Sequence, residues 1–191
     1  NEVLVKVHAF GLNRPDILQR QGLYPMPKGV TPVPGLEVAG EVVAVGADVS
    51  QFKVGDAVCG LTNGGGYAEY CVVPESQTLT IPTSVSFVQA AAIPETFFTV
   101  WANVFQMGKA KAGETALIHG GTSGIGTTAL MLCNALGLKT FATVGSDEKV
   151  QAISHLTTAI NYKTHDFEQA INEATDNAGV DIILDMVGAP Y

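Results

Sequence analysis

The second half of the chain alternates between short apolar runs and helical patterns, and this alternation constrains the fold most strongly. Four segments have the composition of buried strands: residues 114–119, 140–144, 159–161 and 181–185. Strands that alternate with helices form a parallel sheet with helices on both faces, which is an α/β architecture. Four strands make slightly more than one mononucleotide-binding half of a doubly wound Rossmann sheet. We therefore expect an incomplete sheet and a chain that is part of a longer protein.

A glycine-rich loop follows the first of these strands. Residues 119–126, with the sequence HGGTSGIG, lie between the strand and an apolar helix expected over residues 127–136, which Gly137 would end. Glycines let the backbone approach a diphosphate closely, and a helix N-terminus offers free N–H groups. The loop could also be a plain turn, but a strand before it and a helix after it favour dinucleotide binding. It lacks the Lys-Ser/Thr ending of a P-loop, which disfavours a nucleoside triphosphatase.

The end of the second strand bears on which dinucleotide is bound. NAD-specific sites place an Asp or Glu about 20 residues past the loop, where it accepts from the ribose 2′-hydroxyl. Here that position is Gly145, followed by Ser146 and, one turn later, Lys149. A hydroxyl and an ammonium favour a 2′-phosphate, so we expect NADPH. Ser146 would also suit a helix N-cap and Lys149 a solvated side chain, while Asp147 and Glu148 fit a first helical turn.

The residues before about position 90 have a different character. They are rich in Gly, Pro and Val, and turn signals separate strand-like runs at residues 3–7, 38–46 and 67–74. Such a pattern indicates a compact β barrel or sandwich. A helical stretch over residues 86–104, interrupted by Pro94, comes next. We place the domain boundary so that the two domains comprise residues 1–92 and 93–191.

Charge and cysteine content disfavour several other classes. The formal net charge of −8 argues against non-specific nucleic-acid binding, and no apolar run is long enough to cross a bilayer. We therefore expect neither a nucleic-acid nor a membrane partner. Cys59, Cys71 and Cys133 form no CxxC pair and are expected to be free thiols in a reducing compartment, here the cytoplasm.

Motifs along nearly the whole chain resemble one superfamily. They occupy residues 11–16, 19–25, 34–40, 54–56, 64–70, 90–96, 119–126, 161–163 and 185–188. Together they resemble the medium-chain dehydrogenase/reductase superfamily, and within it the zinc-free quinone oxidoreductases of the p53-inducible, NADPH-using type. The resemblance implies a GroES-like β-barrel domain with substrate and catalytic groups at residues 1–92. A Rossmann NADP-binding domain, truncated in its C-terminal half, would follow at residues 93–191.

The resemblance also assigns roles to individual residues. Those expected around the cofactor are Thr99 at the nicotinamide end, Ser123, Gly124, Ile125 and Gly126 at the diphosphate, Gly145, Ser146, Lys149 and Tyr162 at the 2′-phosphate, and Val187 and Gly188 after the fourth strand. Asn13 and Tyr24 match positions that line the nicotinamide and substrate pocket. Asn13 could instead hold a turn before a helix together with Asp16, and Tyr24 could be a packed aromatic.

The zinc ligands of the superfamily's alcohol dehydrogenases are missing from the sequence. Those enzymes carry a Cys near the position of Asn13, a His at that of Leu36 and a four-cysteine lobe, so the resemblance implies no metal. The histidines show no ligand spacing with each other or with the cysteines, and His119 is expected to end a strand. In one departure from the family pattern, the link at residues 155–159, before Tyr162, is two residues short.

The resemblance implies a zinc-independent reductase that transfers a hydride from NADPH to a quinone or similar conjugated carbonyl acceptor. A small-molecule quinone or enone would be its partner, and the full-length protein would be a homodimer. Three alternatives stay open. They are an enoyl-thioester or enone reductase on the same scaffold, a non-catalytic, crystallin-like NADPH-binding protein, and a zinc alcohol dehydrogenase.

Overall fold

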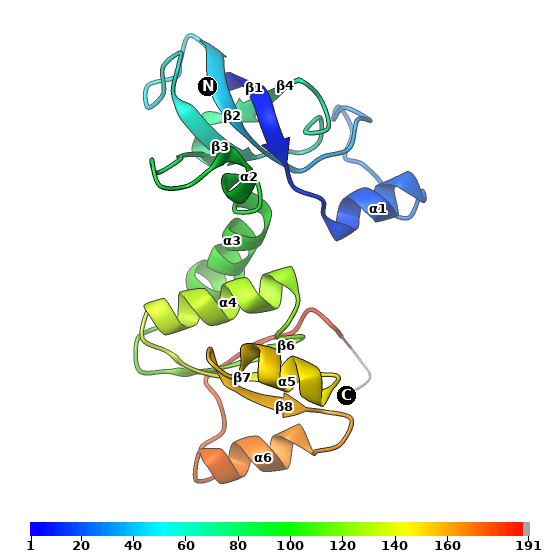
Figure 1. Cartoon of the computed structure of the whole chain (residues 1–191), viewed down its shortest axis with the longest axis vertical. Helices are drawn as coiled ribbons and strands as arrows, with labels where there is room; N and C mark the ends of the chain where they lie inside the picture. The colour runs from blue at the N-terminus through cyan, green and yellow to red at the C-terminus, as the bar shows by residue number, and fades with distance from the viewer. Residues whose placement is uncertain (189–191) are drawn as a thin grey trace. The chain divides into compact units, whose positions relative to one another are not determined.

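The computed structural model describes residues 1–188, which form two compact units (Figure 1). The first unit comprises residues 1–95 and the second begins at Thr96, so the division lies within helix α3 (Pro94–Val100), slightly after the expected boundary at 92/93. Among residues 1–188, no helix is both long and apolar enough to cross a membrane.

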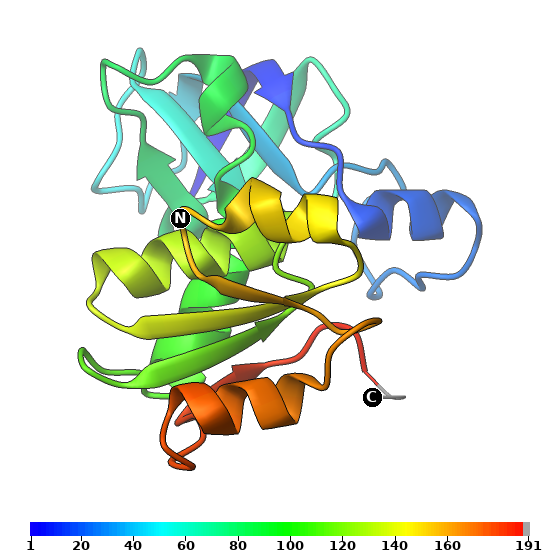
Figure 2. The same ribbon diagram turned by 60° about the horizontal axis from the view of Figure 1, so that its bottom comes forward.

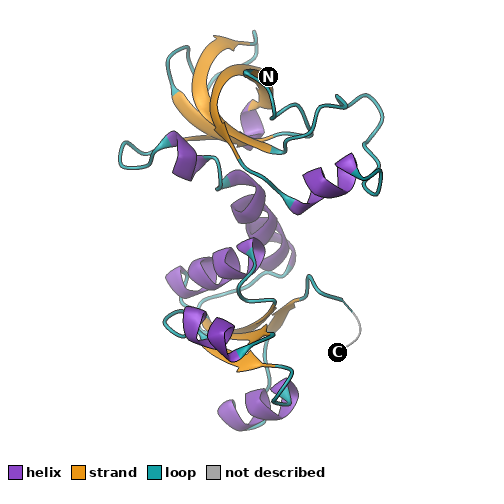
Figure 3. Cartoon of the chain, turned by 45° about the vertical axis from the view of Figure 1, so that its right-hand side comes forward, coloured by secondary structure: helices purple, strands orange, loops and turns teal. Residues whose placement is uncertain are grey.

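The first unit is built on one antiparallel sheet of five strands, which curls strongly (Figure 3). Its strands are β1 (Glu2–Phe10), β2 (Glu37–Val45), β3 (Ala57–Leu61), β4 (Tyr70–Pro74) and β5 (Thr78–Thr80), in the order β4-β1-β2-β3-β5. Helix α1 (Arg14–Arg20) lies between β1 and β2, the 3-10 turn η1 (Glu75–Gln77) between β4 and β5, and α2 (Phe87–Ala90) after β5. The expected barrel is thus a half-barrel with β4 and β5 as the edge strands among the described residues.

Alternation of small and β-branched residues gives this sheet two apolar faces. Val38 on β2 packs in a cluster of valines that includes Val3 and Val73, while the next residue, Ala39, belongs to a separate cluster with Ala90 and Ala91 at the end of α2. Successive side chains of a strand point to opposite faces, so one strand supplies both clusters. Helix α2 therefore covers one face of the sheet and the valine cluster fills the other.

The second unit is a parallel sheet flanked by helices. In chain order it contains η2 (Trp101–Met107), β6 (Thr115–His119), α4 (Gly124–Ala135), β7 (Lys139–Val144), α5 (Asp147–Ile153), β8 (Thr158–Asn161), α6 (Phe167–Ala174) and β9 (Ile182–Leu184). The strands lie in the order β8-β7-β6-β9, all parallel. This is the order 3-2-1-4 of a Rossmann sheet, which confirms the expected fold class.

Helices cover both faces of this sheet, with α4 and α5 on one side and α6 on the other (Figure 2). Ile118 on β6 packs with Leu130 of α4 on the first face. Leu117 and Phe141, which point the other way, pack with Ile171 of α6. A strand covered on both faces must be apolar throughout, which explains the continuous apolar runs in the sequence.

Some expected boundaries were wrong. Helix α4 begins at Gly124, three residues before the expected start at 127, because Ser123 caps it and the last glycines of the loop are helical. The expected helix over residues 86–104 is divided into α2, α3 and the π-helical segment η2, with Pro94 at the start of α3. Proline suits a first helical turn, where its missing N–H has no partner to lose. The strand expected from residue 67 begins at Tyr70.

Replacing Leu130 by Ala tests the packing of α4 on the sheet. Leu130 is fully buried, so the truncation should leave a cavity and lower the free energy of unfolding by about 2–5 kcal/mol. Met131, the next residue of α4, is 45% exposed, and Met131→Ala should change stability by no more than about 0.5 kcal/mol. Urea unfolding of the full-length variants measures both effects. Equal losses for the two variants would contradict the placement of α4.

Candidate functional site

The loop between β6 and α4 presents backbone N–H groups at a helix N-terminus. The N–H groups of Gly120 and Gly121 both donate to the Thr143 carbonyl, at 3.1 and 3.0 Å, and this ties the loop to β7. The Ser123 hydroxyl caps α4 by accepting from the Gly126 N–H at 2.9 Å. The N–H groups before Gly126 in the first turn have no partner within the helix, and together with the helix dipole they favour an anion.

Two glycines of this loop have different surroundings, and only one of the two positions requires glycine for packing. A Cβ on Gly126 would lie 2.3 Å from the Gly120 carbonyl oxygen, so glycine is required there for α4 to pack against the loop. A Cβ on Gly124 would meet only the Thr96 methyl carbon, at 3.4 Å, and Gly124 is exposed. The space in front of Gly124 is therefore open to a ligand that approaches the helix N-terminus.

The segment after β9 lies against this loop. The Ser123 hydroxyl donates to the Met186 sulfur at 3.3 Å. An Asp185 carboxylate oxygen accepts the N–H groups of Val187 and Gly188, both at 2.9 Å, and these hydrogen bonds lower the pKa of Asp185. The structure thus brings the loop residues and the two residues expected after the fourth strand to the same edge of the sheet.

The ends of β7 and β8 form the neighbouring part of this edge. A Cβ on Gly145 would lie 3.1 Å from the Tyr162 hydroxyl and 3.6 Å from Cε of Lys163, so both side chains cover the face of this glycine. Ser146 caps α5, because its hydroxyl accepts the Lys149 N–H at 3.4 Å. Tyr162, Lys149 and Lys163 are all exposed, which leaves a hydroxyl and two ammonium groups at this end of the sheet.

The Asp147 carboxylate, at the start of α5, is held by a hydrogen bond. Asp147 accepts from the buried Asn161 amide at 2.7 Å, and this bond joins the start of α5 to the end of β8. One of the two adjacent acidic residues of the sequence thus has a structural role in tying α5 to β8.

The short link before β8 is closed by hydrogen bonds from neighbouring elements. The Asn134 amide donates to the Leu156 carbonyl at 2.6 Å, and the Thr157 hydroxyl donates to the Thr140 carbonyl at 2.8 Å. These bonds set where β8 begins, and the Tyr162 N–H then donates to the Val144 carbonyl at 3.1 Å. Tyr162 therefore lies beside Gly145.

His119 ends β6 as expected and is a structural residue. Its Nδ1 lies 2.8 Å from the Thr143 hydroxyl, and its ring meets that of Phe167 edge-on with centroids 5.3 Å apart. Burial lowers the pKa of His119, although the charge of Asp185 opposes this shift. A neutral, packed imidazole thus links the ends of β6 and β7.

Asn13, in the first unit, belongs to a buried network of carboxyl groups. It is the N-cap residue of α1; its N–H donates to Asp16 at 2.8 Å and its side-chain amide donates to Glu37 at 2.8 Å. Asp16 also accepts from the Gly35 N–H at 3.0 Å and from the Tyr67 hydroxyl at 2.8 Å. The turn-holding role expected as an alternative for Asn13 is thus confirmed, and it leaves the side chain half-buried.

The other expected site residues have simpler surroundings. Tyr24 follows α1 and is 42% exposed, so it is not a packed core aromatic. Thr99 is on α3, one turn after Thr96, and its carbonyl accepts the Asn103 amide at 2.8 Å. The side chain of Ile125 packs against the main core of the second unit, which leaves only its backbone for a ligand.

Three residues were missed as site candidates from the sequence. Lys163 and Met186 contact the expected site, and Glu37 binds the Asn13 side chain. Lys163 had a signal, since it directly follows Tyr162 at the end of a strand. Met186 had the same kind of signal, since it directly precedes Val187 after a strand. Glu37 had only its place in the motif at residues 34–40, because its contact with Asn13 depends on the tertiary fold.

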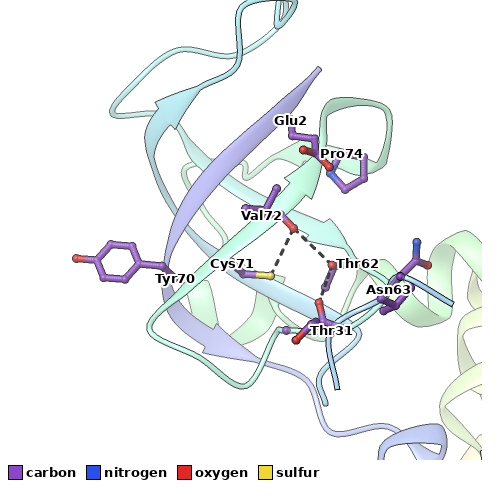
Figure 4. A pocket seen from close by; sticks show the side chains of 12 residues that line it. Glu2, Thr31, Thr62, Asn63, Tyr70, Cys71, Val72 and Pro74 are labelled. Atoms are coloured by element: carbon purple, nitrogen blue, oxygen red, sulfur yellow. Dashed lines mark hydrogen bonds between the residues drawn. The ribbon is translucent and has the colours of Figure 1, made fainter. Parts of the chain in front are cut away.

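A pocket of about 410 Å³ in the first unit offers no reactive group (Figure 4). It lies beside the edge strand β4, where the Thr62 hydroxyl donates to the Gly64 carbonyl at 2.9 Å and the Cys71 thiol donates to the Val72 carbonyl at 3.6 Å. Burial raises the pKa of the Cys71 thiol, which keeps it protonated and unreactive. Among residues 1–188, no three His, Cys, Asp or Glu side chains are grouped so that they could hold a metal ion.

A Rossmann-type sheet with an open helix N-terminus at the carboxyl ends of its strands is typical of dinucleotide-binding enzymes. Two family models match the chain: the alcohol dehydrogenase GroES-like domain over residues 1–83, and the zinc-binding dehydrogenase domain over residues 124–191. The chain belongs to the medium-chain dehydrogenase/reductase superfamily.

Individual relatives agree with this assignment. The chain is 35% identical over 190 residues to quinone oxidoreductase of Rattus norvegicus, covering 98% of this chain and 58% of the relative. Among solved structures it resembles a quinone oxidoreductase of Pseudomonas syringae (38% identity, TM-score 0.85, 98% of this chain and 58% of that one). It also resembles Escherichia coli quinone oxidoreductase complexed with NADPH (33%, 0.84, 99% and 59%) and the CurK enoyl reductase (33%, 0.87, 99% and 60%). The chain spans a little more than half the length of each.

Alanine at Gly126 should destabilise the protein, whereas alanine at Gly124 should have little effect on its stability. Gly126→Ala places a Cβ against the loop backbone and should lower the free energy of unfolding by about 1–3 kcal/mol. Gly124→Ala adds a helix-favouring residue in open space and should change stability by about 0.5 kcal/mol or less. Thermal unfolding of the full-length variants distinguishes the two. A destabilised Gly124→Ala beside an unaffected Gly126→Ala would refute the assignment of the two glycines.

Proposed function

We propose that the protein carrying this chain is a zinc-independent reductase that uses NADPH to reduce a quinone or a similar conjugated carbonyl compound. One observation carries the cofactor assignment: Gly145, without a carboxylate, directly follows β7 and lies beside Tyr162 and Lys163, and Lys149 follows in the first turn of α5. The similarity to quinone oxidoreductases, one of them complexed with NADPH, supports both the reaction and the cofactor.

The residues at the edge of the sheet fit a dinucleotide. The open N-terminus of α4, at Ser123, Gly124, Ile125 and Gly126, would hold the diphosphate, as the uncovered face of Gly124 allows. The 2′-phosphate would be held by Gly145, Ser146, Lys149, Tyr162 and the additional Lys163. Thr99 would lie at the nicotinamide end, and Val187 and Gly188, which follow β9, would line the cofactor. The Gly145 position admits no larger side chain without displacing Tyr162.

The expected preference for NADPH follows from the charges at this site. One charge-assisted hydrogen bond contributes about 1.5–3 kcal/mol, which corresponds to roughly a ten- to hundredfold preference. Lys149 and Lys163 are exposed, so solvent and salt will place the effect near the lower end of this range. The hydrogen bond from Asn161 keeps the Asp147 carboxylate engaged at the end of β8.

The chemistry needs little from the protein beyond orientation. Bound NADPH supplies the hydride, and the reduced oxygen of a quinone can take its proton from water. Asn13 would donate from its amide to the acceptor carbonyl, and the exposed ring of Tyr24 would pack beside the acceptor. A conjugated carbonyl is already electrophilic, and Asn13 and Leu36 stand where the zinc enzymes of the superfamily carry ligands, so we assign no metal.

An enoyl-thioester or enone reductase is the second candidate. It would use the same cofactor on the same scaffold, and the similarity to the CurK enoyl reductase favours it specifically. The two candidates differ in the acceptor bond that is reduced. A homodimer and a cytoplasmic location remain predictions from the sequence.

Cofactor oxidation by the full-length protein tests the proposed function. With an ortho-quinone acceptor, we expect fast oxidation of NADPH and little oxidation of NADH, measured by absorbance at the nicotinamide band. Faster turnover with NADH would refute the 2′-phosphate site. Turnover with an enoyl thioester but no quinone would favour the second candidate, and tight NADPH binding without turnover would favour a non-catalytic protein.

Replacing Lys149 by Ala tests the 2′-phosphate site separately. Loss of this ammonium should raise the KM for NADPH about tenfold and leave the KM for NADH nearly unchanged, because NADH has no 2′-phosphate. Lys111→Ala is the matched control, since it removes an exposed ammonium before β6, at the opposite end of the strands. Equal increases for both cofactors in Lys149→Ala would show that Lys149 does not contact the 2′-phosphate.

A further inference from the structure

The carboxyl group of Glu37 accepts hydrogen bonds on both of its oxygens. Oε1 accepts from the Asn13 side-chain amide at 2.8 Å, and Oε2 accepts from the Glu95 backbone N–H at 2.9 Å. Glu37 is 3% exposed and begins β2, and Gly11 makes room for it, since a Cβ on Gly11 would collide with Oε1. The group is therefore held from both sides without a cation: among residues 1–188 the one salt bridge is between Lys53 and Asp56.

This arrangement decides which end of the Asn13 amide faces inward. An ionised carboxylate can only accept hydrogen bonds, so Asn13 must present its NH2 group and not its oxygen to Glu37. The Asn13 backbone is fixed at the same time by its N–H bond to Asp16 at 2.8 Å. With backbone and amide both fixed, the amide has one N–H committed to Glu37 and a second N–H available to a ligand.

We propose that Glu37 is a positioning residue that fixes the Asn13 amide as a hydrogen-bond donor toward the carbonyl oxygen of the acceptor. This inference rests on the proposed function, which supplies the acceptor carbonyl that Asn13 would contact. It goes beyond that function by assigning a role to a buried residue that touches neither substrate nor cofactor. A preoriented donor stabilises the negative charge that develops on the carbonyl oxygen during reduction.

A glutamine at position 37 would reverse the polarity of the pair. The Glu95 backbone N–H cannot turn, so the single oxygen of the glutamine must accept from it, and the glutamine NH2 would then face Asn13. Asn13 would have to rotate and present its oxygen inward. Glu37→Gln in the full-length protein should therefore lower kcat/KM for the quinone about tenfold, mainly through kcat.

A second variant separates polarity from packing. Asn13→Asp alone opposes two carboxyl groups and should be less stable than the wild type, whereas Asn13→Asp combined with Glu37→Gln restores a donor–acceptor pair with reversed direction. We expect the double variant to recover the unfolding midpoint lost in Asn13→Asp but not the turnover. Glu75→Gln is the matched control: Glu75 accepts two backbone N–H groups, from Ser50 and Gln51, in the same unit, and its replacement should leave turnover unchanged.

The pH profile gives a readout that a purely structural role would not change. Burial is the main cause that raises the pKa of Glu37, with the charge of Asp16 adding to it, while the bonds from Glu95 and Asn13 oppose the shift. Protonation turns one Glu37 oxygen into a donor, so wild-type turnover should fall as the pH decreases through this pKa. The other titratable groups that act on or with Glu37 are Asp16, Glu95, Tyr67 and Cys59. Glu37→Gln should lose this acidic limb, because none of those groups bonds the Asn13 amide.

The outcomes distinguish this inference from the proposed function. An active wild type with an equally active Glu37→Gln variant, or a double variant no more stable than Asn13→Asp, overturns the role of Glu37 and leaves the proposed function intact. A wild type that reduces no quinone or enone overturns both the proposed function and the role of Glu37 in turnover. The stability comparison then still shows whether Glu37 sets the polarity of Asn13.

Discussion

The close backbone contact between Gly126 and Gly120 is the constraint on which the rest of the second unit depends. Because no side chain separates α4 from the loop, the helix starts after only four residues from the end of β6, and its free N–H groups face the carboxyl edge of the sheet. The Thr143 carbonyl then fixes the loop to β7, and the Ser123 hydroxyl brings in the segment after β9. One contact between two glycines thus places the N-terminus of α4, the proposed diphosphate site, beside the end of β7 and the segment after β9.

The elements with strong local signals could be predicted from the sequence. The strands of the parallel sheet were found because burial on both faces requires continuous apolar runs, and Ser146 was found as a cap because capping is a local property. Helix α4 began three residues early because a capping serine inside a glycine run overrides the poor helix propensity of glycine. The π-helical segment after Val100 had no signal in residue type.

The candidate site could be predicted from the sequence only where its residues are close together along the chain. Gly145, Ser146 and Lys149 follow one strand, so their proximity is local, whereas the cover that Tyr162 and Lys163 give to Gly145 requires β8 to lie beside β7. The link before β8 is short, and hydrogen bonds from Asn134 and Thr157 fix it to neighbouring elements. Tyr162, which directly follows β8, therefore lies next to the end of β7. Residues joined by tertiary contact, such as Glu37 with Asn13, carry no sequence pattern because their separation along the chain varies freely with the loops between them.

The same carboxyl chemistry has opposite consequences in different environments of this chain. Exposed Asp185 and half-buried Glu75 accept two backbone N–H groups each, and these bonds lower the pKa of both. They therefore stay ionised and add stability that is lost only as the pH falls through their lowered pKa values. Glu37 is buried and Glu95 is half-buried, and this burial raises the pKa of both, so their ionisation costs stability as the pH rises. Retaining Glu37 at the start of β2 therefore has a thermodynamic cost, which a residue needed only for packing would avoid. An apolar residue of similar volume could fill the space without this cost, but it could not accept a hydrogen bond from Asn13 and so could not fix the orientation of its amide.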